Sequence, residues 1–303
     1  MLTKERMKAY VEANEHLISV KKQAPGITVL KYKNKVFYKN LWTPELCELR
    51  GTVVDDDFNI IQRPFTKIFN AGESKAPRIL LKDPVTAPEK VNGFMGAATW
   101  HNNGLFISTT GSIASDFADM AREHIEKLTW DWEAHRNMTY IFEIVDERDP
   151  HIVPEKVGAW LLGARKKEWG SRQHELGQGK LDSVAIGMRC LRPKWRRYNT
   201  YAELKEEVRT ISHEGFVIWD DKGHEIKIKS PYYLATKFLG RKSEQRLNEL
   251  LEDTRSAKQI LDEEYYPILD YLNQGKNKDT FIEMTEQERF AFLRKYFDKE
   301  ILS

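Results

Sequence analysis

The sequence predicts an α+β fold in which antiparallel sheets with interspersed helices are followed by a small all-α domain. Up to about residue 240, short runs of β-forming residues are separated by turn residues. After Gly240 the apolar positions instead recur at helical spacing. A chain of 303 residues is long enough for one large domain with an appendage, or for two domains, at roughly 100–200 residues per domain. We therefore predict a division into residues 1–240 and 241–303.

Alternation of apolar and polar residues predicts the strands of the first part, and the segments between them favour tight turns. Hairpins are expected around the turns at 56–57 and 101–103. The predicted strands are 51–55, 58–64, 93–100, 104–110, 138–146, 215–220 and 224–230. The predicted helices are 2–14, 43–49, 115–127 and 200–210. Asn199 or Thr200 is expected to cap the last of these helices.

Two apolar stripes predict the helices after residue 240. The first keeps a spacing of about 3.6 residues, and Pro267 is expected to kink or interrupt its helix. The second follows Thr285 and Glu288, which form a capping box. Stripes of this kind are typical of a packed core rather than of a ligand site. They consist of Ala257, Ile260, Leu261, Ile268, Leu269 and Leu272, and of Phe290, Leu293, Phe297 and Ile301.

The composition is that of a globular protein, with 41% hydrophobic and 31% charged residues. No apolar run approaches the roughly 18 residues that cross a bilayer, and the charged start lacks the apolar stretch of a signal peptide. Cys47 and Cys190 form neither a disulfide framework nor a zinc spacing. We therefore expect a soluble cytoplasmic protein without a membrane partner.

The net charge of +2 excludes binding of nucleic acid by bulk charge alone, so any polyanion must be held locally. The densest basic stretch is 189–198, where five cations are interleaved with Trp195 and Tyr198. Cations next to flat rings suit phosphates and stacked bases. Taken alone, however, this segment is better interpreted as a solvated loop with a packed tryptophan.

Two segments in the first part could carry chemistry. Lys90 lies in a turn before a predicted strand, where Gly93 would let the backbone approach a ligand and the amine could act as a nucleophile. Glu143 lies in an otherwise apolar strand, so its carboxylate must be paired or must bind something. A sugar hydroxyl and a structural salt bridge explain Glu143 equally well, and a lysine in a turn is weak evidence by itself.

Two further segments lie near residues 214–230. Glu214 precedes the predicted strand 215–220, and alternation in the next strand places Lys227 and Lys229 on one face with the isoleucines on the other. Two neighbouring cations repel each other, and a phosphate between them would explain their position. An edge strand protected by lysines would give the same pattern.

The order of these segments is more specific than any one of them. Lys90-x-Asn-Gly, Phe142-Glu143, Glu214-Gly-Phe-Val and Lys227-Ile-Lys229-Ser together resemble the covalent nucleotidyltransferase superfamily of ATP-dependent ligases and RNA capping enzymes. The surrounding LRGTVVD, RPFTKIFNAGE, TGSIAS, DPHIV and KIKSPYY segments resemble RNA ligases of the T-even bacteriophage, tRNA-repair type. The resemblance covers roughly residues 35–240 and does not extend over the helical tail.

The resemblance implies an ATP-grasp-like ligase core and a three-step reaction. Lys90 would attack the α-phosphate of ATP, AMP would pass to an RNA 5′-phosphate, and a 3′-hydroxyl would then displace AMP. An unperturbed lysine, with a pKa of about 10.4, is almost wholly protonated at neutral pH, so neighbouring cations would have to lower that pKa. Lys227 and Lys229 would supply these cations and share the catalytic role with Lys90.

The resemblance also assigns the remaining residues of the nucleotide site. Glu89 would lie in the nucleotide pocket, Glu143 would hold the ribose, and Glu214 would position a hydrated Mg²⁺ or Mn²⁺ ion. Lys227 and Lys229 would contact the α-phosphate. Arg50 and Lys67, from the LRG and RPFTK segments, would contact the nucleotide and its outer phosphates.

The implied partner is RNA with 5′-phosphate and 3′-hydroxyl ends, such as nicked tRNA, bound by a monomer in the host cytoplasm. The chain departs from the family at Asn92, where Asp is most frequent. This difference puts the rate of catalysis in doubt. The helical tail favours the RNA ligase branch, since DNA ligases and capping enzymes are expected to carry a β-barrel there. The alternatives are a GTP-using capping guanylyltransferase, a single-strand DNA ligase and a non-catalytic nucleotide- or RNA-binding module.

Overall fold

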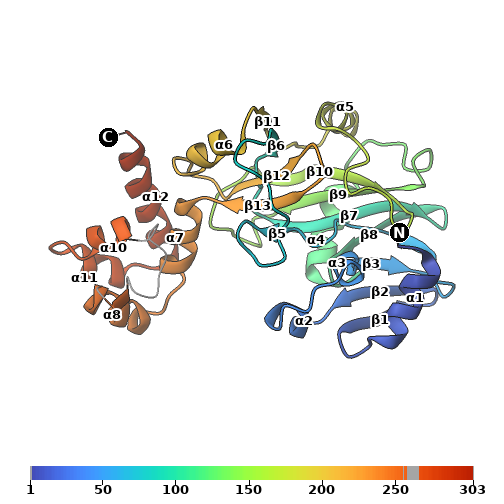
Figure 1. The fold of residues 1–303 in the computed structure, drawn as a ribbon, viewed down its shortest axis with the longest axis horizontal. Coiled ribbons are helices and arrows are strands. Elements are labelled where there is room, and N and C mark those ends of the chain that lie inside the picture. The colour runs from blue at the N-terminus through green and yellow to red at the C-terminus, as the bar shows by residue number, and fades with distance from the viewer. Residues whose placement is uncertain (1, 255, 258–265, 303) are drawn as a thin grey trace. The chain divides into compact units, whose positions relative to one another are not determined.

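The structure, a computed structural model, describes residues 2–254, 256–257 and 266–302 and has the predicted α+β architecture (Figure 1). The chain forms two compact units, each built from several segments. Unit 1 comprises Met1–Phe69, Val91–Pro150 and Glu155–Trp195, and unit 2 comprises Asn70–Lys90, His151–Pro154 and Arg196–Ser303. The boundary that we place between residues 240 and 241 stays a prediction.

Within its described residues, unit 1 contains two four-stranded antiparallel sheets, with strand orders β1-β2-β3-β4 and β10-β9-β7-β8 (Figure 1). The strands are β1 (Ile18–Ala24), β2 (Ile27–Tyr32), β3 (Arg50–Val54), β4 (Ile60–Gln62), β7 (Phe94–His101), β8 (Gly104–Thr109), β9 (Met138–Val145) and β10 (Gly158–Lys166). The helices are α1 (Lys4–Ala13), α2 (Asn34–Tyr38), α3 (Pro44–Glu48), α4 (Asp116–Ile125) and α5 (Gln178–Met188).

Local sequence explains the predicted hairpins of unit 1, both of which are confirmed. Asn102 and Asn103 join β7 to β8 with φ angles of 48° and 59°, a left-handed conformation that Asn adopts more readily than most residues. Strands β3 and β4 pair in the antiparallel sense on either side of the 56–57 turn. The alternation in β9 places Tyr140 and Phe142 in the core formed with α4 and α5.

Five elements of unit 1 escaped the sequence-based prediction: β1, β2, α2, β10 and α5. Strand β1 is rich in lysine and glutamine, so its alternation is weak, and it pairs with β2 across a turn at Gly26, whose φ is +68°. Strand β10 contains Gly163, and helix α5 contains Gly179 and Gly187, residues of low propensity for these elements. Tertiary packing overrides the local preference in these elements.

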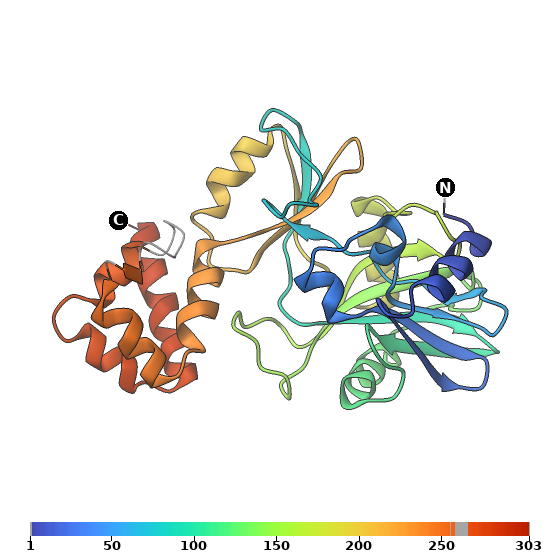
Figure 2. The ribbon, with the colours of Figure 1, turned by 60° about the horizontal axis from the view of Figure 1, so that its bottom comes forward.

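The described strands of unit 2 form one sheet in the order β11-β6-β12-β13-β5. The two outer strands, β11 and β5, each contain a point in the sequence at which the chain passes between unit 1 and unit 2. Helix α6 (Tyr201–Val208) packs along this sheet (Figure 2), and Thr200 caps it by accepting a hydrogen bond from the backbone N–H of Glu203. The strands are β5 (Phe69–Asn70), β6 (Val85–Pro88), β11 (Trp195–Tyr198), β12 (Gly215–Asp220) and β13 (Glu225–Lys229).

The helical tail of unit 2 has its own apolar core, which also includes residues of α7 (Figure 2). Its helices are α7 (Pro231–Gly240), α8 (Glu244–Glu252), α10 (Tyr266–Leu272), α11 (Asn277–Glu283) and α12 (Glu286–Leu302). Ala235 and Leu239 of α7 belong to that core, and Ile152 and Val153 pack with Tyr232, Tyr233 and Phe290 beside it. The helices therefore begin to cluster about ten residues before the boundary that we predict.

The predicted apolar stripes of the tail are buried wherever the structure describes them. The buried members are Ala257, Ile268, Leu269, Leu272, Phe290 and Leu293. Ile260 and Leu261 lie outside the described residues, as do the side chains of Phe297 and Ile301. The capping box is confirmed, because the Thr285 backbone N–H donates to Glu288 Oε2 at 2.8 Å. Among the described helices, none is long and apolar enough to cross a membrane.

Candidate active site

The β12–β13 hairpin holds three of the predicted site residues. Lys227 and Lys229 lie opposite Val217 and Gly215 in the antiparallel register, and Glu214 immediately precedes β12. Ile226 is buried in the core between the sheet and α6, and Ile228 packs against that core. The predicted alternation is thus confirmed, and the two lysines share the opposite face.

Gly215 allows Glu214 to approach β13. Its φ of +132° is strained for any residue with a side chain, and an added Cβ would lie 2.0 Å from the carbonyl oxygen of Ile228. The Gly215 carbonyl accepts a hydrogen bond from the Lys90 backbone N–H at 2.8 Å, and the Glu214 carbonyl accepts one from Ser230 at 3.0 Å. Backbone contacts therefore bring Lys90, Glu214 and the end of β13 together in unit 2.

One buried carboxylate lies between two ammonium groups in this cluster. Lys90 Nζ lies 2.9 Å from Glu214 Oε2, and Lys229 Nζ lies 3.5 Å from Glu214 Oε1. The Glu214 side chain is 2% exposed, whereas those of Lys90 and Lys229 are 21% and 20% exposed. Solvent can therefore reach the two amines while the carboxylate stays buried beneath them.

The environment of Lys229 favours its neutral form. Burial is the main cause that lowers the pKa of Lys229, and the positive charges of Lys237 and Lys90 lower it further against the opposing effect of Glu214. Its ammonium also lies 4.9 Å from the ring centroid of Tyr233. The repulsion is mutual, so Lys229 likewise disfavours a charge on Lys90.

The direct contact with Glu214 modifies the sequence-based hypothesis for Lys90. That hypothesis placed cations beside the amine, whereas the structure adds a carboxylate at ion-pair distance. An opposite charge this close favours the ammonium form. Glu214 and Lys229 therefore act on the charge of the Lys90 amine in opposite senses, since the carboxylate favours that charge and the second ammonium disfavours it.

Glu143 and Arg50 gather around Met95 in unit 1. Met95 lies directly opposite Glu143 in the register of β7 and β9, and Arg50 Nη1 lies 3.8 Å from its sulfur. Glu143 Oε1 accepts a hydrogen bond from the Gly93 backbone N–H at 3.2 Å. The structure explains the glycine at position 93 by close packing rather than by the approach of a ligand. A Cβ added to Gly93 would lie 2.3 Å from the carbonyl oxygen of Ile144.

Lys67 lies among aromatic rings of unit 1. Its Nζ is 4.7 Å from the ring centroid of Phe69, 5.4 Å from that of Trp42 and 6.0 Å from that of Phe37. Its backbone N–H donates to the carbonyl of Cys47 at 2.9 Å. Ring faces attract an ammonium group, so these contacts hold the Lys67 side chain in place within unit 1.

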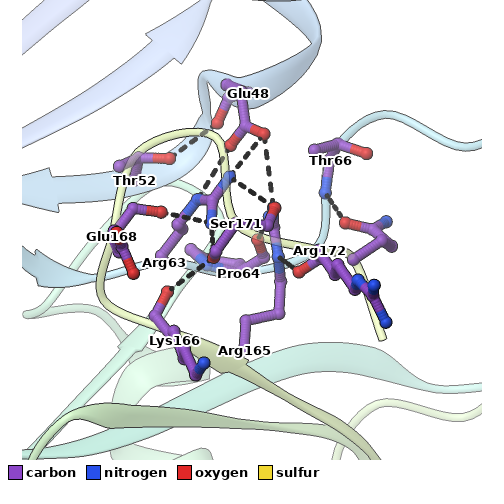
Figure 3. A network of polar contacts seen from close by, with 11 residues as sticks. Glu48, Thr52, Arg63, Pro64, Thr66, Arg165, Lys166, Glu168, Ser171 and Arg172 are labelled. Carbon is purple, nitrogen blue, oxygen red and sulfur yellow. Dashed lines mark hydrogen bonds and ion pairs between the residues drawn. The ribbon is translucent and has the colours of Figure 1, made fainter. Parts of the chain in front are cut away.

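A buried ionic network anchors the segments that carry Arg50 and Lys67, and the sequence-based analysis missed it (Figure 3). Arg63 donates from Nη2 and Nε to the two carboxylate oxygens of Glu48, at 2.7 and 3.1 Å. Arg165 Nη2 donates to the same carboxylate at 3.2 Å. Both guanidinium groups are at most 1% exposed, so one carboxylate compensates two buried cations.

The same network fixes a loop of unit 1 against these segments (Figure 3). Arg63 also donates to the carbonyl of Glu168 and to the hydroxyl of Ser171, and Arg165 donates to the carbonyl of Pro64 at 2.6 Å. Glu48 and Arg63 lie close in sequence to Arg50 and Lys67, respectively. The sequence did show a charged residue at each of these segments, Glu48 next to LRG and Arg63 in RPFTK. The residues near each of them in the sequence, however, did not indicate which partner it would pair with.

Three of the five cations in the basic segment 189–198 are paired with carboxylates. Arg192 pairs with Asp182 at 3.0 Å, Arg197 pairs with Asp221 at 2.7 Å, and Arg196 pairs with Glu207. Residues 195–198 form strand β11, so the interpretation of the whole segment as a loop is wrong at its end. His213 has a local structural role, because its Nδ1 accepts a hydrogen bond from the Gly215 backbone N–H.

The protein offers few ligands for a divalent ion. No group of three or more His, Cys, Asp or Glu side chains that could hold a metal ion occurs in the part of the chain that the structure describes. Glu214 supplies one carboxylate, and both of its oxygens face lysine amines. Such a donor set fits an ion that keeps its waters and arrives bound to phosphates, and it does not fit a resident metal centre.

Comparison with known proteins places this chain in a family. A family model described as RNA ligase matches residues 48–233, which include all the predicted site residues and exclude most of the helical tail. The chain belongs to the RNA ligase family. RNA ligase 1 of Bacteriophage TS2126 is 30% identical to this RNA ligase family member in an alignment of 205 residues, and the match covers 59% of this chain and 50% of that protein. The chain thus spans about half the length of the curated relative that it matches.

Solved structures share the fold of this RNA ligase family member at low sequence identity. An archaeal ATP-dependent RNA ligase superposes with a TM-score of 0.56 at 16% identity, and the match covers 98% of this chain and 77% of that one. A putative ATP-dependent DNA ligase from Aquifex aeolicus gives a TM-score of 0.53 at 14% identity, covering 97% and 78%. These likenesses show the ligase nucleotidyltransferase fold.

Proposed function

We propose that the chain is an ATP-dependent RNA ligase that joins 5′-phosphate and 3′-hydroxyl ends through a lysyl-AMP intermediate on Lys90. The observation that carries the proposal is the cluster in unit 2, where the Lys90 amine lies 2.9 Å from buried Glu214 and shares that carboxylate with Lys229. Membership of the RNA ligase family over residues 48–233 supports the same reaction class.

In the first step, Lys90 Nζ attacks the α-phosphorus of ATP. A nitrogen–phosphorus bond forms, the bond from the α-phosphorus to the bridging oxygen breaks, and pyrophosphate leaves. The lone pair on Nζ must be free, so the ammonium proton must first be lost. Lys229, which shares Glu214 with the reacting amine, contacts the α-phosphate together with Lys227, and their positive charge offsets the negative charge that develops on its oxygens.

Glu214 controls the protonation of Lys90 in this proposal. While its carboxylate is in contact with Lys90, the ammonium form is favoured and the amine is unreactive. Glu214 would hold a hydrated Mg²⁺ or Mn²⁺ ion that is bound to the phosphates of ATP, and the ion would supply positive charge against the phosphate oxygens. A Glu214 carboxylate shared with such an ion would hold the Lys90 proton less strongly.

The remaining site residues bind the nucleotide. Glu143 accepts hydrogen bonds from the ribose hydroxyls, Glu89 borders the nucleotide pocket, and Arg50 and Lys67 contact the outer phosphates. Two observations support the roles of Glu143, Arg50 and Lys67: Arg50 and Glu143 both lie beside Met95, and Lys67 Nζ lies against aromatic rings. In the second and third steps AMP passes to the RNA 5′-phosphate, and the 3′-hydroxyl displaces AMP.

Intact-mass spectrometry after incubation with ATP and Mg²⁺ tests the proposal. We expect the protein to gain one adenylyl group and Lys90→Ala to lose this gain. Lys222→Ala removes another lysine of unit 2, one that pairs with Asp83 on the surface, and should keep the gain. A parent protein without an adduct would favour a non-catalytic nucleotide- or RNA-binding module. Asn92, in place of the more frequent Asp, is the reason to test for this alternative.

Two comparisons then separate the related enzymes. Better labelling by GTP than by ATP would indicate a capping guanylyltransferase. Competition between RNA and single-stranded DNA ends would identify a DNA ligase if the DNA is sealed faster. Sealing of a broken tRNA anticodon stem-loop in preference to an unstructured oligonucleotide would support tRNA repair as the role.

A further inference from the structure

An exposed aromatic and basic surface lies around α2 in unit 1. We call it the α2 surface and define it by Lys33, Lys35, Phe37, Tyr38 and Lys39. Phe37 is 56% exposed and Tyr38 is 80% exposed, and their rings meet edge to face with centroids 5.6 Å apart. Single exposed apolar residues are common, but two large adjacent rings at this exposure indicate a surface that binds something.

The charge of this surface has one sign. Residues 31–42 contain four lysines and no acidic residue. None of these lysines forms an ion pair within the part of the chain that the structure describes, and the Lys33 ammonium donates only to the carbonyl of Glu15. The segment 189–198 differs, since three of its arginines are paired with carboxylates. The lysines around α2 are therefore available to RNA phosphates without first breaking an ion pair among the described residues.

The α2 surface is continuous with a residue of the proposed nucleotide site. Phe37 presents its ring to Lys67 Nζ at 6.0 Å, and Trp42, just after α2, presents its ring to the same ammonium at 5.4 Å. An RNA strand with one phosphate at Lys67 would therefore also reach the exposed rings and lysines of α2, which lie in the same unit.

We infer that the α2 surface binds single-stranded RNA, with a base stacked on Tyr38 and with Lys35 and Lys39 against the adjacent phosphates. This inference deepens the proposed function and rests on it for the choice of RNA as the ligand. Stacking on aromatic rings combined with backbone contacts from lysines is the usual way to hold single strands without reading their sequence. A protein partner fits less well, since lysine is depleted at protein–protein interfaces.

Binding of an oligonucleotide that cannot be sealed tests the inference. Fluorescence anisotropy is measured with a single-stranded RNA carrying a 5′-hydroxyl and a blocked 3′ end. Tyr38→Ala should weaken binding about fivefold or more, as expected for loss of one base–aromatic stack of about 1 kcal/mol or more. Tyr38→Phe should bind like the parent because it keeps the ring. Ile186→Ala removes another apolar side chain of unit 1, one that is 78% exposed, and should also bind like the parent.

A second set of variants separates stacking and phosphate contacts from apolar docking. Tyr38→Leu keeps an apolar side chain without a ring face, so it should bind RNA as weakly as Tyr38→Ala. Lys35→Ala/Lys39→Ala should reduce the slope of log K against log salt by about 1.4, at about 0.7 per phosphate contact on a single strand. Lys8→Ala/Lys205→Ala removes two exposed lysines elsewhere and should leave the slope unchanged.

Each outcome decides the question. Parent-like RNA binding by Tyr38→Ala and by Lys35→Ala/Lys39→Ala would overturn the inference, and adenylylation of Lys90 in the same samples would show that the proposed function survives it. If Tyr38→Leu restores binding, or if Tyr38→Ala instead abolishes self-association in sedimentation, the surface docks a protein or a second copy and the inference is wrong. Failure of the parent to form lysyl-AMP would overturn the proposed function alone, since the anisotropy measurement needs no chemistry.

Discussion

Replacement of Glu48 by Gln tests how the buried network of unit 1 is held together. Arg63 and Arg165 are at most 1% exposed, and the Glu48 carboxylate, 2.7 and 3.2 Å from them, is their shared counter-charge. Removing one partner of a buried ion pair costs about 3–5 kcal/mol, because the other charge is left uncompensated. Hydrogen bonds from the guanidinium groups to the Glu168 and Pro64 carbonyls remain, so we expect about 3 kcal/mol.

Urea denaturation followed by tryptophan fluorescence measures this change, since seven of the eight tryptophans belong to unit 1. For an m-value of about 2–3 kcal/mol per M, Glu48→Gln should lower the midpoint by about 1 M or more. Glu45→Gln makes the same chemical change three residues earlier in α3, where the Arg6 partner is 53% exposed. That control should cost about 1 kcal/mol at most. Equal shifts for the two variants would refute the electrostatic account of the network.

Two further predictions concern unit 1. Gly93→Ala would place a Cβ 2.3 Å from the Ile144 carbonyl oxygen and 3.0 Å from Glu143 Cγ, so it should lower the thermal midpoint and raise the KM for ATP; unchanged values would show that the backbone shifts freely. The Arg148 guanidinium holds the pKa of Asp146 well below its usual range, so the folded state binds fewer protons than the unfolded state and stability is lost as the pH falls below about 4. Asp146→Asn should therefore flatten the fall in the free energy of unfolding between about pH 4 and pH 2, and an equally steep fall would contradict the assignment.

The local patterns in the sequence predicted much of the fold correctly. The alternation of Lys227 and Lys229 with isoleucines, the hairpin at Asn102 and Asn103, and the capping box at Thr285 all depend on residues within a few positions of one another. Strands and helices with weak patterns, such as β1 and α5, were missed because their stability comes from packing against other elements.

The sequence by itself determined the family resemblance, the α+β class and the set of candidate residues, because periodicity and short motifs are local properties. Only the tertiary structure decided which charges meet. It brings the Lys90 amine to the Glu214 carboxylate across 124 positions of the chain, and it buries two arginines on Glu48 from positions 15 and 117 residues away. It also pairs three of the four arginines of 189–198 and leaves the lysines around α2 without ion-pair partners among the described residues. Coulomb interactions depend on distance and burial in space, and neither quantity can be read from separation along the chain.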